Sequence, residues 1–255
     1  MKKIIKKILL SFGLDIRKIN PELKNRLTFD EIYKLKIKNN PIIFDIGANK
    51  GQSIKRFRKI FPNSVIYAFE PNIFEYEILK NKYKEDKKII LNNFAVGDKR
   101  ETKSFYITAK SGSSSFNKVN FDTKWIEKRS KQFNTTKEGY IKSIENVKVI
   151  KLDDYCEENN IKNIDILKID TQGYEDKVLA GCEDILQKNI ITAVELELMF
   201  DNVYERYLTF SDVEKFLIPN NFRFSAISTA NNNLFEGLVF FADLIYLNKS
   251  KIDLK

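Results

Sequence analysis

Asp45-Ile46-Gly47-Ala48-Asn49-Lys50-Gly51 and Ala68-Phe69-Glu70-Pro71 are the two stretches that decide the fold of this chain. Each stretch ends an apolar run typical of a β-strand, and one helix-length segment separates them. This order is typical of the first half of a nucleoside-cofactor site in a doubly wound α/β fold. The glycines let the backbone approach a ligand closely, because no Cβ blocks the turn. Glu70, at the end of the second strand, is placed to accept hydrogen bonds from two ribose hydroxyls.

The loop after the first strand indicates which cofactor is bound. A dinucleotide site usually carries G-x-G-x-x-G, whereas this chain has Asp-x-Gly-x-Asn-x-Gly, beginning at Asp45. A carboxylate at Asp45 would repel a phosphate, but it attracts an ammonium or a sulfonium group. S-adenosylmethionine (SAM) carries both cations and no phosphate, so the loop favours SAM over NAD. The alternative is a tight strand-to-helix turn without a ligand.

Further motifs follow in a fixed order along the chain. They are Asn93-Phe94-Ala95-Val96-Gly97-Asp98, the serine-rich residues 111–116, Val149-Ile150-Lys151-Leu152-Asp153, Ile166-Leu167-Lys168-Ile169-Asp170-Thr171-Gln172-Gly173-Tyr174-Glu175 and Val178-Leu179-Ala180-Gly181-Cys182. In this order and spacing the chain, over about residues 41–200, closely resembles the FkbM family of SAM-dependent methyltransferases. The segment beginning at Lys168 is the most specific element. Gln172 departs from the family, which often has Glu at this position.

The pattern of apolar segments predicts the architecture. Strands are expected at residues 42–46, 65–69, 89–95, 103–108, 164–169, 191–198, 222–227 and 238–247, with an extended segment at 147–151. Helices are expected at 22–38, 51–60, 74–83, 153–159, 174–181 and, with Ser211 as N-cap, 211–217. Alternating strands and helices that end in a hairpin indicate an α/β fold with a doubly wound, mostly parallel seven-stranded sheet, the Rossmann-like fold of class I SAM-dependent methyltransferases. We expect one such domain at 41–255, after a basic helical N-terminal extension at 1–40.

Ligands of such a sheet gather at the carboxyl ends of its strands. Asp45 and the backbone of residues 47–51 are expected to hold the methionine end of SAM, and Glu70 its ribose. Ala95 and Val96 are expected to contact the adenine. The complete set of expected cofactor-binding residues is Asp45, Gly47, Ala48, Asn49, Gly51, Glu70, Ala95, Val96 and Asp98.

The expected catalytic residues are Asp170, Lys168 and Glu195. The chain contains no histidine, so a general base must be Asp, Glu, Lys or Tyr. Asp170, between a strand and Gly173, is the first candidate for that base, and Lys168 is either structural or stabilises an alkoxide. Asp170 and Glu195 could equally form a Mg²⁺ site, because oxygen ligands on neighbouring strand ends suit a hard cation.

Composition excludes several classes of function. Without histidine, Ser-His-Asp and Cys-His catalysis and histidine-ligated zinc are excluded. The two cysteines, Cys156 and Cys182, form no disulfide framework, so we expect a cytoplasmic protein. Of the formal net charge of +9, residues 1–40 carry +7. The catalytic body is therefore nearly neutral, whereas an enzyme of nucleic acids more often spreads basic residues over its active face.

The N-terminal extension suggests contact with a membrane. At helical spacing, Ile4, Ile5, Ile8, Leu9 and Phe12 fall on one side of residues 2–12 and the lysines on the other. Such a helix can lie on an anionic membrane surface, at the inner face of the membrane, or can pack its apolar side on the domain. Both alternatives stay open at this point.

The middle of the chain is the least regular part. Residues 111–146 are polar, show weak periodicity and contain Trp125, the only tryptophan. A segment of this length is often a lid or a substrate loop. The alternative is a solvated connector with one helix near Trp125.

Together these features indicate a SAM-dependent O-methyltransferase that acts on a hydroxyl group. The family resemblance implies a sugar of a surface polysaccharide or glycolipid as the acceptor, with a secondary-metabolite alcohol as the alternative. A non-enzymatic binding or scaffold protein with this fold at the membrane surface is the third interpretation. We expect a small-molecule or glycan partner and no nucleic acid.

Overall fold

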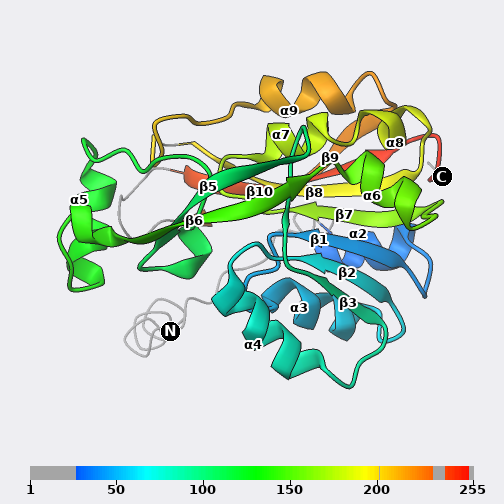
Figure 1. Cartoon of the computed structure of the whole chain (residues 1–255). Coiled ribbons are helices and arrows are strands. Elements are labelled where there is room, and N and C mark those ends of the chain that lie inside the picture. Colours follow the sequence, from blue (N-terminus) through cyan, green and yellow to red (C-terminus); the bar gives the residue numbers. More distant parts are fainter. Residues whose placement is uncertain (1–26, 201, 232–238, 253–255) are drawn as a thin grey trace, which may run out of the picture.

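The computed structural model describes residues 27–200, 202–231 and 239–252 (Figure 1). The amphipathic helix expected at residues 2–12 lies outside these residues. The extension contributes α2 (Phe29–Lys36), which is shorter than the expected helix at 22–38. Thr28 begins α2 because its backbone N–H donates to the Glu31 carboxylate over 2.7 Å and its side chain accepts the Glu31 N–H, a capping box.

The core of the molecule is the seven-stranded sheet that the sequence predicts. Its strands are β1 (Ile42–Ile46), β2 (Val65–Phe69), β3 (Ile89–Asn92), β7 (Ile164–Ile169), β8 (Ile191–Met199), β9 (Phe222–Asn231) and β10 (Val239–Asn248). The order is β3-β2-β1-β7-β8-β10-β9. The first five strands are parallel, and β10 is antiparallel to β8 and β9. This arrangement confirms the doubly wound fold and the final hairpin.

Helices cover both faces of the sheet (Figure 1). One face packs on α2, α3 (Gln52–Ile60) and α4 (Ile73–Tyr83), with Phe57 and Leu79 fully buried against the strands. The other face packs on α6 (Leu152–Glu158), α7 (Glu175–Ala180), α8 (Glu183–Gln187) and α9 (Phe210–Leu217). Because both faces are covered, β7 is buried along its whole length, as its continuous apolar sequence requires.

A second, three-stranded sheet was not predicted. It contains β4 (Ala95–Val96), β5 (Glu101–Thr108) and β6 (Ile141–Ile150) in the order β4-β6-β5. The single strand expected at 89–95 is therefore wrong: residues 89–92 pair with β2, and residues 95–96 pair with β6. The extended segment expected at 147–151 begins earlier, at Ile141.

The polar segment 111–146 is ordered by one aromatic cluster. It contains a short 3₁₀ turn, η2 (Ser111–Ser113), then α5 (Lys124–Gln132) and a second turn, η3 (Glu138–Tyr140). Trp125 is 3% exposed and packs edge-on to Tyr140, with ring centres 5.7 Å apart. Its ring also lies parallel to that of Phe240 from β10. The helix expected near Trp125 is confirmed as α5, but burial of these rings holds it against the domain, so the segment is not a solvated connector.

One helix start also differs from the sequence prediction. The N-cap of α9 is Thr209 rather than Ser211, because the Thr209 N–H donates to the Asp212 carboxylate over 2.9 Å. Within the part of the chain that the structure describes, no helix has the length and apolar character needed to cross a bilayer.

Gly47 joins the loop after β1 to the end of β7. Its φ is +87°, and a Cβ on this residue would lie 2.0 Å from the carbonyl oxygen of Asp170. The Asp170 N–H in turn donates to the carbonyl of Ile46 over 2.9 Å. Only glycine allows this approach, because any other residue would be strained in φ and would also displace the β7 end.

Gly47→Ala is therefore expected to lower the free energy of unfolding by about 3 kcal/mol or more. Gly112→Ala is the matched control, because a Cβ on Gly112 meets no atom within 4 Å. Urea unfolding measures both variants. Equal unfolding free energies for the two variants would contradict the close contact at Gly47.

Candidate active site

A cavity of about 480 Å³ lies at the carboxyl ends of β1, β2, β7 and β8. One side is formed by the β1–α3 loop, Glu70 and the short strand β4. Residues 110–114, α5 and β10 contribute to the rest of the lining. The site therefore has two parts: a half built from the strand ends that the sequence identifies, and a half built from the segment around Trp125.

Glu70 is held in place by backbone N–H groups. One carboxylate oxygen accepts the N–H of Asn49 over 2.7 Å, and the other accepts the N–H of Asn72 over 2.8 Å. Each oxygen keeps a lone pair for a further donor, so two ribose hydroxyls can bind. Burial raises the pKa of the Glu70 carboxyl to about 7, although the two N–H donors act in the opposite direction.

The other residues of this half surround the same space. Ala48 and Asn49 from the glycine loop line the cavity, as do Ala95 and Val96 of β4. Ala95 and Val96 are 5% and 1% exposed, so they offer an apolar wall with backbone polar groups at its edge. The expected contact of Ala95 and Val96 with an adenine ring stays a prediction.

Asp45 does not line the cavity as expected. Its side chain is fully buried behind the glycine loop, where one oxygen accepts the hydroxyl of Ser53. The other oxygen has no hydrogen-bond partner among the described residues and lies 3.9 Å from the Lys168 ammonium. Burial raises the pKa of Asp45. We therefore revise its role: Asp45 positions Ser53 and Lys168 and does not itself hold the methionine end of SAM.

Two further residues of the expected cofactor set lie outside the cavity. The Asp98 carboxylate pairs with the ammonium of Lys177 at 2.7 Å. Gly51 is the residue before α3, with a φ of +80°, and the position of its missing Cβ is filled by Leu79 and Tyr83. Gly51 therefore shapes the turn, and Asp98 fixes α7, without contact to a ligand in the cavity.

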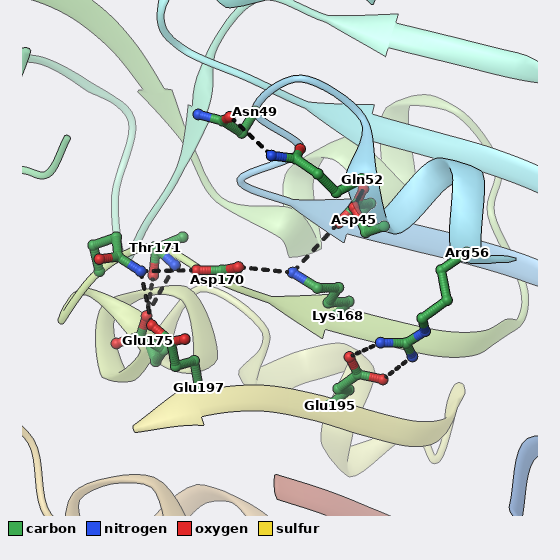
Figure 2. Close-up of polar contacts among 12 residues, drawn as sticks. Asp45, Asn49, Gln52, Arg56, Lys168, Asp170, Thr171, Glu175, Glu195 and Glu197 are labelled. Atoms are coloured by element: carbon green, nitrogen blue, oxygen red, sulfur yellow. Dashed lines mark hydrogen bonds and ion pairs between the residues drawn. The ribbon is translucent and has the colours of Figure 1, made fainter. Parts of the chain in front are cut away.

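Lys168 and Asp170 lie together at the end of β7 (Figure 2). The Lys168 ammonium is 3.1 Å from one oxygen of Asp170. Burial would lower the pKa of Lys168, but the carboxylates of Asp170, Asp45 and Glu195 raise it above its ordinary value. Burial would raise the pKa of Asp170, but Lys168 and the Gln172 amide outweigh burial and hold it below its usual range. The pair is therefore ionised at neutral pH.

Gln172 connects Asp170 to a second acid, Glu197 on β8. Its amide nitrogen donates to Asp170 over 3.0 Å and to Glu197 over 2.8 Å. Burial, and then the charge of Asp170, raise the pKa of Glu197 well above its ordinary value. A Glu in place of Gln172, as the family often has, could not donate to both acids in its charged form.

Glu195 does not have the role expected from the sequence. Its two oxygens accept both terminal nitrogens of Arg56, at 2.8 and 2.5 Å (Figure 2). The hydroxyl of Tyr33 also donates to Glu195 over 2.6 Å. With its oxygens turned to these partners, Glu195 is unsuited to form a Mg²⁺ site with Asp170. Among the described residues, no cluster of three or more acids or cysteines could hold a metal ion.

The remaining lining residues were not among the expected site residues, although the sequence indicates a lid or substrate loop at 111–146. They include Lys110, Trp125 and Arg129, together with Phe240, Phe241 and Asp243 of β10. Burial and nearby carboxylates raise the pKa of Asp243 to about 6. In the sequence, the serine-rich stretch and the single tryptophan were the available signals for Lys110, Trp125 and Arg129. No sequence signal marked the last strand, because antiparallel pairing of β10 with β8 places it there.

The residues of the cavity fit SAM. Glu70 can accept from a ribose, and Ala95 and Val96 form an apolar wall for a base. Asp170, in its charged form beside the glycine loop, attracts a cation and would repel a phosphate. A bound SAM would supply an electrophilic methyl group on its sulfonium.

The chain is similar to known methyltransferases. The family model of the methyltransferase FkbM domain matches residues 45–224. The 2-O-methyltransferase NoeI of Sinorhizobium fredii (strain NBRC 101917 / NGR234) is 26% identical over 181 residues, which cover 71% of this chain and 72% of NoeI. The crystal structure of methyltransferase FkbM from Methylobacillus flagellatus KT matches with a TM-score of 0.51 at 13% identity, over 82% of this chain and 44% of that chain. This chain thus spans less than half of the solved protein, and the likeness shows a shared fold.

Glu70→Gln is expected to weaken SAM binding about tenfold or more, the effect of losing hydrogen bonds to a charged group. Ribose hydroxyls donate better to a carboxylate than to a carboxylic acid. SAM affinity of the unmodified protein should therefore rise as the pH passes upward through the Glu70 pKa of about 7, and binding should release a proton there.

Calorimetry on either side of that pH tests both expectations, with Asp98→Asn as the matched control outside the cavity. A Glu70→Gln protein with the affinity and pH dependence of the unmodified protein would remove Glu70 from the binding site.

Proposed function

This chain belongs to the FkbM family of SAM-dependent methyltransferases, and from that premise we propose that it transfers the methyl group to a hydroxyl of a sugar. The observation that carries the proposal is the position of Asp170. Its charged carboxylate lines the same cavity as the glycine loop and Glu70, and the backbone contact at Gly47 fixes its distance from that loop.

The proposed reaction needs an acceptor oxygen held in line with the sulfonium methyl. Holding the two reacting atoms close and collinear can contribute about 7–11 kcal/mol to lowering the barrier. Asp170 accepts a hydrogen bond from the acceptor hydroxyl, orients a lone pair toward the methyl group, and takes the proton as the new C–O bond forms. The products are the methyl ether and S-adenosylhomocysteine.

The neighbours of Asp170 suit this role. Lys168 is not a base, because its raised pKa keeps it protonated. Its charge keeps Asp170 ionised, and Gln172 turns the carboxylate by donating to its second oxygen over 3.0 Å. Burial and the charge of Asp170 favour the protonated form of Glu197, and its carboxyl is a hydrogen-bonding group for other hydroxyls of the acceptor.

A sugar is the acceptor that the cavity favours. Trp125, Phe240 and Phe241 offer aromatic rings beside polar and charged groups, and a sugar presents C–H faces to such rings and hydroxyls to polar groups. The relative NoeI is named a 2-O-methyltransferase, which supports an oxygen acceptor. The basic N-terminal residues support, in addition, a role in a polysaccharide or glycolipid pathway at the inner face of the membrane.

Asp170→Asn is expected to lower turnover by about 10²–10⁴, the range for loss of a general base. The amide keeps the size of the side chain but removes its charge and its basicity. Transfer of labelled methyl from SAM to a panel of neutral and anionic sugars measures turnover, and calorimetry measures SAM affinity.

Asp98→Asn, a change of the same kind outside the cavity, should keep full activity. Near-normal turnover by a folded Asp170→Asn protein would remove Asp170 from the reaction.

A further inference from the structure

We propose that the acceptor sugar carries an anionic group, a phosphate or a carboxylate, which binds between Lys110 and Arg129 beside Trp125. This inference rests on the proposed function, because it identifies the acceptor's class through the part of the cavity formed by residues 110–114 and α5. All three side chains line the cavity.

The two cations differ from the others that line the cavity. Lys168 is paired with Asp170 at 3.1 Å, and Arg56 is paired with Glu195. Neither Lys110 nor Arg129 has a carboxylate at ion-pair distance among the described residues. The only hydrogen bond of the Arg129 guanidinium to these residues goes to the neutral amide oxygen of Gln132, over 2.7 Å.

Lys110 and Arg129 also repel each other. Partial burial lowers the pKa of Lys110, and the charge of Arg129 lowers it further, against the opposing effect of Glu197 and Asp170. Two unpaired cations at one wall cost free energy, and a bound anion removes that cost by pairing with both. A neutral sugar would leave the repulsion in place.

Trp125 adds further hydrogen-bond donors without acceptors. Its indole N–H is buried and has no acceptor in the described part of the chain, and the same holds for the Nε–H of Arg129. The Arg129 guanidinium lies 5.7 Å from the centre of the Trp125 ring. Donors and positive charge are concentrated here, so the matching ligand group is rich in acceptors and negatively charged.

The position of this group relative to Asp170 determines which acceptor fits. Lys110 precedes Ser111, whose hydroxyl accepts the Asn49 side-chain amide of the glycine loop over 3.4 Å. Gly47 of that loop contacts the Asp170 backbone. Lys110 is near enough to Asp170 for the two charges to influence each other. An acceptor bound by both would place its hydroxyl at Asp170 and its anionic group at Lys110 and Arg129. A sugar phosphate or a sugar acid meets both conditions.

The single tryptophan makes the site directly observable. We would saturate the protein with S-adenosylhomocysteine and titrate it with glucose 1-phosphate, glucuronate and methyl glucoside, following the emission of Trp125. The variants are Lys110→Gln, Arg129→Gln and, as the matched control on the exposed side of α5, Lys124→Gln. The two anionic probes separate a phosphate site from a carboxylate site.

The expected result is a saturable change in emission with at least one anionic probe and none with methyl glucoside at the same concentration. Lys110→Gln and Arg129→Gln should each weaken anion binding about tenfold or more, and Lys124→Gln by less than about twofold. Equal binding of neutral and anionic probes, or unchanged anion binding in Lys110→Gln, would overturn the inference. Because Lys110 is exposed, that variant keeps the test valid even where Arg129→Gln disturbs the packing on Trp125.

The same variants separate this inference from the proposed function. Suppose that the protein methylates a neutral sugar and that Lys110→Gln leaves the KM for this sugar unchanged. That result would contradict the anionic group on the acceptor and would support the proposed O-methyl transfer. Suppose instead that anion binding depends on Lys110 but that no sugar hydroxyl in the panel is methylated. That result would support the anion site and would contradict the proposed function.

Discussion

The ion pair of Lys168 with Asp170 is the interaction on which the site depends. Lys168 is 9% exposed at the end of a strand that is buried on both faces, and a charge in this place requires partners. Asp170 at 3.1 Å and Asp45 at 3.9 Å provide them. The pairing keeps Asp170 ionised beside the glycine loop, where we propose that its charge orients the acceptor. The same pairing allows the charged Lys168 to lie in a buried strand.

Much of the fold, and the cofactor half of the site, could be predicted from the sequence because local patterns encode them. The glycine loop at Gly47, the acid at Glu70 and the strand ending at Asp170 each combine a strand period with a turn signal, and parallel strands bring their carboxyl ends together. The same patterns could not predict which acidic side chains are buried or paired. The sequence indicated a ligand-binding role for Asp45, yet its side chain is buried behind the loop. Glu195 is ion-paired with Arg56.

The part of the cavity around Trp125 depends on contacts between residues far apart in the sequence. Trp125 packs near Tyr140 and Phe240, and this cluster holds α5, with Arg129, at the cavity. No period or spacing in residues 111–146 predicts such an arrangement, since it follows from pairing of the second sheet and of β10. The part of the cavity at Glu70 is therefore set by local sequence, and the part at Trp125 by tertiary packing.

The pH dependence of turnover in Lys168→Gln tests the central claim most directly, because that claim is that Lys168 keeps the base ionised. Removal of the ammonium takes away the main influence that lowers the pKa of Asp170. Asp170 then accepts a proton at a higher pH, so the acidic limb of the turnover profile should move to higher pH than in the unmodified protein. An acidic limb at the same pH in both proteins would contradict the account, since the ionisation that limits turnover would then be independent of Lys168.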